Sequence, residues 1–236
     1  MKEQIAEVCK KLRLGRNIAE IAEQIKADSH QEYLLKVLKK ELDYREKTRI
    51  NRLIKQAKFY ALKTFDSYFF DEIRLPKGLS IEDLKEATFV DEQRNLILYG
   101  NVGTGKTHMA IAAGVAACKK GKVVRFFRTA SLVNQLNDAK KEGTLNQFLR
   151  QLFKTDLLIC DEWGYIPLDR DGSKLLFQVI SECYEQRSVI ITTNLEFSKW
   201  VNIFYDEQMT AAMIDRLVHH GYLLLFEGES YRIKNS

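Results

Sequence analysis

One stretch of the chain, residues 100–107, constrains the fold more than any other. It reads Gly-Asn-Val-Gly-Thr-Gly-Lys-Thr and fits the phosphate-binding pattern G-x-x-x-x-G-K-[ST] at every required position. A short apolar run of strand length, 95–99, precedes it, and an alanine-rich run that suits a helix, 108–120, follows it. The order strand, glycine turn, helix predicts a loop whose main-chain N–H groups cradle a polyphosphate at a helix N-terminus.

The loop is expected to bind ATP. Lys106 would reach the β- and γ-phosphates, and Thr107 would ligate Mg²⁺. The predicted ATP-binding residues are Gly100, Asn101, Val102, Gly103, Thr104, Gly105, Lys106, Thr107 and His108. A glycine-rich turn without a ligand is the alternative, and the matching flanks argue against it.

The composition is that of a globular protein in the cytoplasm. The chain is 45% hydrophobic and 29% charged, with no apolar run long enough to span a membrane and a charged start that lacks the apolar core of a secretion signal. The four cysteines are far apart, which argues against a zinc ribbon or a disulfide framework and predicts small buried thiols. His219 and His220 are adjacent, and neighbouring helical residues do not converge on one metal ion.

Positive charge is concentrated near the N-terminus. Residues 36–63 contain ten Lys or Arg and three acidic residues, a net of +7, whereas the whole chain has a formal net charge of +5. Such an excess is typical of a surface that contacts nucleic-acid phosphates. A solvated helix face would show the same excess, and charge alone does not choose between the two.

The order of predicted elements indicates three regions. Residues 1–65 have a helical apolar period and form a small all-helical unit; residues 66–94 are an aromatic connector packed on the larger domain; residues 95–236 alternate strands and helices. The strands are expected at 95–99, 123–127, 156–160, 188–193, 222–226 and 231–233, and the helices of this region at 108–120, 131–141, 145–153, 172–186 and 207–219. Continuously apolar strands predict an α/β fold in which a parallel sheet lies between helices.

Two acids follow the predicted strand 156–160. In a phosphate-loop domain that strand lies beside the loop, so its carboxyl end brings Asp161 and Glu162 to the phosphates. Asp161 would hold Mg²⁺, and Glu162 would orient and deprotonate the attacking water. Asn194 follows strand 188–193 and could hydrogen-bond the γ-phosphate or that water; a simple turn asparagine is its alternative.

This combination of loop, acid pair and strand-terminal asparagine resembles the AAA+ ATPases, which implies an AAA+ domain with a five-stranded parallel sheet. The resemblance implies that Arg216 is a finger that acts in trans, in the site of a neighbouring subunit. It also implies that Arg232 is a second sensor that touches the phosphates in cis. A guanidinium suits both tasks because it meets the charge on the γ-phosphoryl oxygens without proton exchange.

Within the initiator and helicase-loader clade of that class, the chain most resembles the IstB-like helper ATPases of insertion-sequence transposons. The stretches that carry the resemblance are 18–22, 34–52 with Glu41 and Arg45, 57–59, 64–66, 100–110, 161–167, 191–194 and 214–216. The chain departs from the pattern of this family at two places. Residues 100–102 lack the common proline, and Gly15 stands where a proline-type break is usual. The extra helix 145–153 resembles the insertion that marks the clade and faces DNA.

The resemblance implies a helper of transposition that forms a helical or ring-like homo-oligomer on duplex DNA with ATP and Mg²⁺. It would then recruit and stimulate a cognate transposase and hydrolyse ATP to dissolve the assembly. The candidate DNA contacts are Lys39, Lys40, Arg45, Arg49, Arg52, Lys55, Lys140, Lys141 and Arg150. The alternatives are a DnaC-type helicase loader, a non-catalytic DNA platform that uses ATP only for assembly, and a small-molecule P-loop kinase, which the basic N-terminus and Arg216 disfavour.

Overall fold

The structure is a computed structural model that describes residues 1–15, 17–66 and 68–228. Arg232 and the expected strand 231–233 therefore lie outside the described residues. The contacts divide the chain into two compact units, Met1–Arg52 and Leu53–Ser236, each of which we describe by itself.

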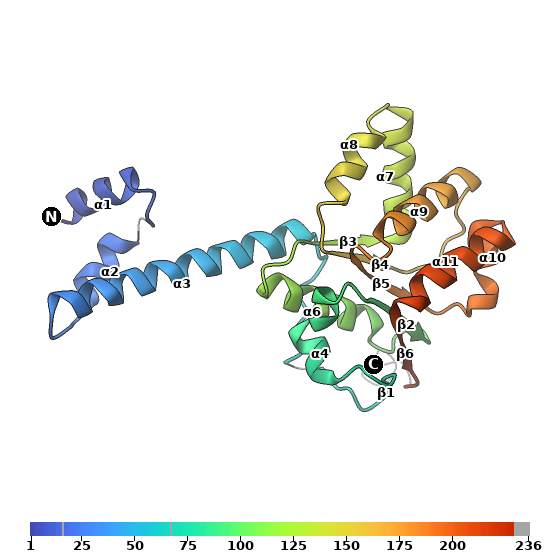
Figure 1. Ribbon diagram of the computed structural model, residues 1–236, viewed down its shortest axis with the longest axis horizontal. Helices are drawn as coiled ribbons and strands as arrows, with labels where there is room; N and C mark the ends of the chain where they lie inside the picture. Colours follow the sequence, from blue (N-terminus) through green and yellow to red (C-terminus); the bar gives the residue numbers. More distant parts are fainter. Residues whose placement is uncertain (16, 67, 229–236) are drawn as a thin grey trace. The chain divides into compact units, whose positions relative to one another are not determined.

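The first unit is helical, as the sequence predicts. It contains α1 (Lys2–Lys11), α2 (Ile18–Gln24) and most of α3 (His30–Ala57), a single 28-residue helix (Figure 1). Its buried core consists of Cys9, Ile18 and Val37, with a few partly buried side chains around them. A core this small gives little stability by hydrophobic burial alone.

The second unit is built on a six-stranded sheet. In sheet order the strands are β1 (Ile73–Arg74), β6 (Gly221–Phe226), β2 (Asn95–Gly100), β5 (Ser188–Thr193), β4 (Leu157–Asp161) and β3 (Val124–Arg128). Five of them are parallel, which confirms the expected five-stranded parallel sheet. The sixth, β1, pairs antiparallel with β6 at one edge and was not expected, because it has only two residues and lies in the connector.

Helices cover both faces of this sheet (Figure 1). The buried helix α6 (Lys106–Lys119) covers one face together with α4 (Ile81–Glu86) and α5 (Thr88–Asp91), two short helices of the connector that the sequence did not predict. The other face carries α7 (Thr129–Lys141), α8 (Leu145–Leu152), α9 (Arg170–Cys183), the short 3₁₀ segment Phe197–Lys199, α10 (Val201–Phe204) and α11 (Glu207–His219). The helix expected at 145–153 is confirmed as α8.

Alternation along the strands explains why both faces are covered. Leu96 and Leu98 of β2 pack in the core on the α6 side, whereas Ile97 packs in the core on the α9 side. A strand that is apolar on both faces requires a layer of helices on each. Tyr68 and Phe70 of the connector, together with Phe65 just before it, are partly buried on the α6 side.

The four cysteines, Cys9, Cys118, Cys160 and Cys183, are free thiols and buried. Burial raises the pKa of the thiols of Cys118 and Cys183 to about 12, and it also raises the pKa of Cys160. These three side chains therefore behave as small apolar groups rather than as thiolates.

Among the residues that the structure describes, every helix is too short or too polar to cross a bilayer.

Candidate nucleotide-binding site

The glycine loop ends where α6 begins. Gly105 caps this helix with a φ of +93°, a left-handed conformation that glycine adopts without a steric cost. The ammonium of Lys106 donates to the carbonyl oxygens of Gly100 at 2.8 Å and Asn101 at 2.5 Å, and the hydroxyl of Thr104 donates to the Asn101 carbonyl at 2.9 Å. The loop is thus curled around the lysine that the sequence assigns to the phosphates.

Lys106 has an unusual acidity for a lysine. Burial lowers the pKa of its ammonium to about 8, although the negative charge of Asp161 acts in the opposite direction. A polyanion beside Lys106 would favour the charged form further. This side chain is therefore suited to bind phosphate near neutral pH.

The structure brings the two expected magnesium ligands together. Thr107 Oγ1 donates to Asp161 Oδ1 at 2.9 Å, so the first turn of α6 and the end of β4 meet. Asp161 is 2% exposed, and Thr192 Oγ1 also donates to its Oδ1 at 2.5 Å. A hydroxyl and a carboxylate are hard oxygen donors of the kind Mg²⁺ prefers, and Mg²⁺ commonly takes its remaining ligands from phosphates and water. The residues therefore fit the ion.

Protein ligands alone do not complete a metal site here. Within the described part of the chain, no three or more His, Cys, Asp or Glu side chains gather in a way that could hold a metal ion. An ion at Thr107 and Asp161 would depend on the phosphates of a nucleotide, which is the usual arrangement for Mg²⁺ in enzymes that act on ATP.

Glu162 follows Asp161 at the carboxyl edge of the sheet, with its backbone in an uncommon conformation. Its φ of +58° is left-handed, which is uncommon for a residue other than glycine and is often found at functional sites. Its N–H donates to Thr192 Oγ1 at 3.0 Å, and its carboxylate Oε2 lies 3.6 Å from Arg128 Nε. The guanidinium of Arg128 also lies over the ring of Tyr60, 5.9 Å from its centroid.

Asn194 follows directly on β5, between the strand of the glycine loop and the strand of the acids. Thr193 pairs with Tyr99 in the register of β5 and β2, so Asn194 lies at the carboxyl edge beside Gly100. The hydroxyl of Thr193 donates to the carbonyl of Trp163 at 3.0 Å and accepts from the N–H of Leu195 at 3.0 Å. These bonds fix the backbone on both sides of Asn194, whose side chain is exposed.

The connector contacts the glycine loop and the start of α6. Tyr68 Oη donates to the Gly105 carbonyl at 3.3 Å, and its ring packs edge-on against His108 with centroids 4.9 Å apart. His108 Nε2 lies 2.9 Å from the carbonyl oxygen of Thr64. His108, predicted as part of the nucleotide site, therefore joins the start of α6 to the connector.

Arg216 contacts its own subunit. Its guanidinium lies over the ring of Phe177 of α9, 5.3 Å from the centroid, and donates to the Ala212 carbonyl of its own helix at 2.9 Å. The end of this helix is tied to the sheet by Asn95, a buried residue of β2. Asn95 Nδ2 donates to the Leu217 carbonyl at 3.3 Å and to the Arg216 carbonyl at 3.4 Å, while its Oδ1 accepts from the N–H of Val189 at 2.9 Å.

The predicted DNA contacts of the second unit are exposed, but some of them have protein partners. Lys140 lies 3.1 Å from Asp171 Oδ2, and Arg150 Nε donates to the Asn146 carbonyl at 3.2 Å. Lys141, at the end of α7, and Lys55, near the end of α3, are exposed. The other candidates, on α3 in the first unit, are also exposed: Lys39, Lys40, Arg45, Arg49 and Arg52.

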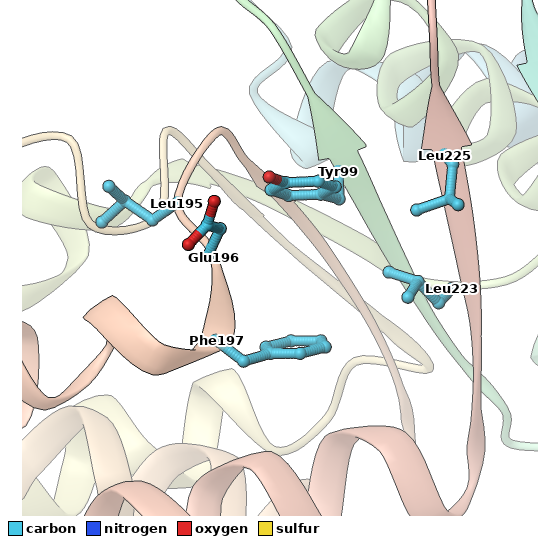
Figure 2. Close-up of a pocket in the computed structure, with 6 residues that line it drawn as sticks. All are labelled: Tyr99, Leu195, Glu196, Phe197, Leu223 and Leu225. Carbon is cyan, nitrogen blue, oxygen red and sulfur yellow. The ribbon is translucent and has the colours of Figure 1, made fainter.

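An apolar pocket of about 200 Å³ lies next to the loop strand. Figure 2 shows it between the ends of β2 and β6 and the segment after β5, lined by Tyr99, Leu195, Glu196, Phe197, Leu223 and Leu225. Its lining is almost wholly carbon, so it does not offer the donors that phosphates require. The phosphate chemistry belongs to the loop and to the strand ends beside it.

Two residues that contact the predicted acids, Thr192 and Arg128, were not predicted from the sequence. Thr192 links Asp161 to the backbone of Glu162, and Arg128 pairs with the Glu162 carboxylate. Arg128 could have been found by the signal that revealed Asp161 and Asn194, because it also follows a predicted strand. Thr192 gave no such signal, since a threonine inside a strand usually reflects β-propensity.

The fold and these contacts define a P-loop ATP-binding domain of the AAA+ class. A crystal structure of the DnaC helicase loader is similar, with a TM-score of 0.53 and 25% identity over 69% of this chain and 96% of that chain. A structure of AMPPCP-bound DnaA from Aquifex aeolicus shares the fold, with a TM-score of 0.57 and 24% identity over 73% of this chain and 52% of that one.

The chain belongs to the IstB-like ATP-binding protein family, whose profile matches residues 9–236. The ATP-binding protein of insertion sequence IS5376 from Geobacillus stearothermophilus is 36% identical over 99% of this chain and 95% of its own length. That of insertion sequence IS21 from Pseudomonas aeruginosa is 36% identical over 87% of this chain and 78% of its own length.

Proposed function

We propose that this protein is a Mg²⁺-dependent ATPase that assembles on duplex DNA in its ATP-bound state and recruits a partner transposase. The observation that carries the ATPase part is the contact of Thr107 and Thr192 with one carboxylate oxygen of Asp161, with Glu162 held beside them. The insertion-sequence context of the relatives and the basic segment 36–63 support the roles in DNA binding and transposition.

The proposed reaction is attack of water on the γ-phosphorus of ATP, with cleavage of the bond to the bridging oxygen and release of ADP and phosphate. Thr107 and Asp161 would hold Mg²⁺, which offsets the phosphate charge when bound. Glu162 would orient the water and accept its proton, and Asn194 would hydrogen-bond the water or the γ-phosphate. Lys106 would bind the β- and γ-phosphates through its ammonium.

Assembly would link nucleotide state to the DNA-bound oligomer. Arg216 lies outside the loop of its own subunit, so in this proposal it leaves Phe177 and enters the site of the neighbouring subunit when ATP is bound. A guanidinium placed in this way can increase hydrolysis by about 10³-fold or more. Arg232 is proposed as the residue that senses the phosphates within the same subunit.

The rival functions are less well supported. A helicase loader would share the ATPase core, but the similarity to DnaC covers 69% of the chain at 25% identity, whereas the IS5376 relative matches 99% at 36%. A non-catalytic DNA platform would not need a carboxylate in the position of Glu162. A small-molecule kinase would not need the basic helix α3.

The test compares the wild-type protein with Glu162→Gln and Lys106→Ala by phosphate release and by electron microscopy with duplex DNA. We expect duplex DNA to stimulate phosphate release by the wild type. Glu162→Gln should bind ATP and DNA, lose hydrolysis at least about 10²-fold, and form longer-lived assemblies, whereas Lys106→Ala should not assemble. A wild-type protein that stays monomeric with ATP, Mg²⁺ and duplex would contradict the proposal, and so would loss of assembly in Glu162→Gln.

A further inference from the structure

A groove in the first unit is lined by four arginines and five other residues. It has a volume of about 310 Å³ and lies between the turn that joins α1 to α2 and one face of α3. Its lining residues are Arg13, Leu14, Gly15, Glu41, Tyr44, Arg45, Thr48, Arg49 and Arg52. The last six recur at helical spacings of three and four, so they share one face of α3.

A buried carboxylate organises this groove. Glu41 is only 3% exposed, although its side chain ends in a carboxyl group. Its Oε1 accepts from the N–H of Gly15 at 2.8 Å and from Arg45 Nε at 2.6 Å, and Arg45 in turn donates to the Arg13 carbonyl at 2.5 Å. Glu41 and Arg45 therefore hold the turn against α3. Arg13, Arg49 and Arg52 line the groove around this contact.

Gly15 packs closely against two side chains at this turn. A Cβ at this position would lie 2.3 Å from Asn17 Oδ1 and 2.5 Å from Glu41 Oε2, so both side chains would have to move. A proline here would have no N–H to give to Glu41. The N–H of Gly15 and the carboxylate of Glu41 therefore fix this turn together.

The basic residues of α3 do not all serve this groove. Arg45, Arg49 and Arg52 line it, whereas Lys39 and Lys40 do not. With about 100° of rotation per residue, Lys39 falls on the opposite face of α3 and Lys40 on its flank. The predicted set of DNA contacts therefore separates into a groove and an outer surface.

We propose that this groove binds a phosphate of the DNA backbone. The inference rests on the proposed function, because it names the residues by which the protein holds duplex DNA. Guanidinium groups bind phosphate oxygens with two parallel hydrogen bonds, and hydroxyl groups such as those of Thr48 and Tyr44 commonly add to such contacts. Contacts of this kind hold DNA without reading its sequence.

The test measures binding of a fluorescent duplex to the full-length protein with a nonhydrolysable ATP analogue, at salt concentrations from about 50 to 200 mM. The groove variant Arg49→Ala/Arg52→Ala and the outer variant Lys39→Ala/Lys40→Ala remove the same charge from the same helix. We expect the groove variant to bind duplex DNA at least about tenfold more weakly, with a salt slope that is smaller by about one, because one phosphate contact is lost. The outer variant should lose about threefold or less in DNA affinity, because it weakens only the long-range electrostatic attraction.

Four outcomes separate the alternatives. An equal loss of DNA affinity in both variants would overturn the proposed phosphate site in favour of diffuse electrostatic attraction. Wild-type DNA affinity in the groove variant would also overturn it. A groove variant that binds DNA normally but no longer binds the transposase would assign the groove to an acidic segment of that protein. A wild type that binds no duplex would contradict the proposed function itself. Circular dichroism of both variants checks that α3 remains helical.

Discussion

Arg128 Nε lies 3.6 Å from the Oε2 atom of Glu162, so the candidate base is already paired with a cation at the end of the neighbouring strand. Because this pairing competes with the attacking water for the carboxylate, we expect Arg128→Ala to raise hydrolysis without DNA by about two- to fivefold, within the range of an exposed ion pair. Phosphate release measures the effect, and Arg128→Lys serves as the charge-preserving control. A lower rate in Arg128→Ala would show that Arg128 assists Glu162.

The hydroxyl of Thr192 joins the magnesium carboxylate to the backbone of the base. It donates to Asp161 and accepts from the N–H of Glu162, so Thr192→Val removes both bonds and leaves groups without partners. We expect the free energy of unfolding to fall by about 1–3 kcal/mol, and hydrolysis to fall at least about tenfold. Urea denaturation and phosphate release measure these effects, and Thr192→Ser should restore most of both. If Thr192→Val hydrolysed ATP at the wild-type rate, Thr192 would not support the positions of Asp161 and Glu162.

Nucleotide affinity should depend on pH through Lys106. Its pKa of about 8 is below the ordinary lysine value, and bound phosphates would raise it, so binding takes up a proton above pH 8. Affinity should therefore be nearly constant below that pH and fall up to about tenfold per pH unit above it. Titration with a fluorescent ATP analogue tests this, and Lys106→Arg, whose guanidinium stays charged, should show weaker dependence. An equal slope in both proteins would assign the effect to another group.

Asn95 should position the helix that carries Arg216. We expect Asn95→Ala to lower the free energy of unfolding by about 2 kcal/mol, because the N–H of Val189 loses its partner. It should also lower hydrolysis while the nucleotide site of the same subunit still binds ATP. Mixing this variant with Glu162→Gln, which assembles and has an intact Arg216, should restore activity, whereas mixing it with Arg216→Ala should not.

Two controls make the Asn95 experiment decisive. Asn146→Ala changes an exposed asparagine and should leave stability and hydrolysis unchanged. Mixing Arg216→Ala with Glu162→Gln must itself restore activity if Arg216 acts in the neighbouring site. Recovery in that mixture but not with Asn95→Ala would show that Asn95 supports the whole fold rather than the finger.

Much of the ATP-binding unit could be predicted because its signals are local. The loop pattern, the apolar strand before Asp161 and the strand before Asn194 each specify a position at the carboxyl edge of a parallel sheet. The convergence of Thr107 and Asp161, 54 positions apart, followed from this rule and is confirmed by their hydrogen bond. The five parallel strands followed from their continuous apolar character.

The remaining features depend on contacts that no local pattern records. The strand β1 has two residues and exists only because β6 provides its hydrogen-bond partners. The short helix α4 begins with a capping box between Ser80 and Asp83, a signal that was present but lies in a region without a clear apolar period. The groove on α3 depends on Glu41, whose burial cannot be recognised from a charged helix alone.

The burial of all four native thiols has a practical consequence for studying this protein in motion. Maleimide dyes react with accessible thiolates, so the wild-type chain should take up little label in its folded state. A cysteine introduced on the surface of α3 and another beside the glycine loop would then carry a donor and an acceptor without removal of any natural residue. Single-molecule energy transfer could follow the two units through each cycle of ATP binding and release.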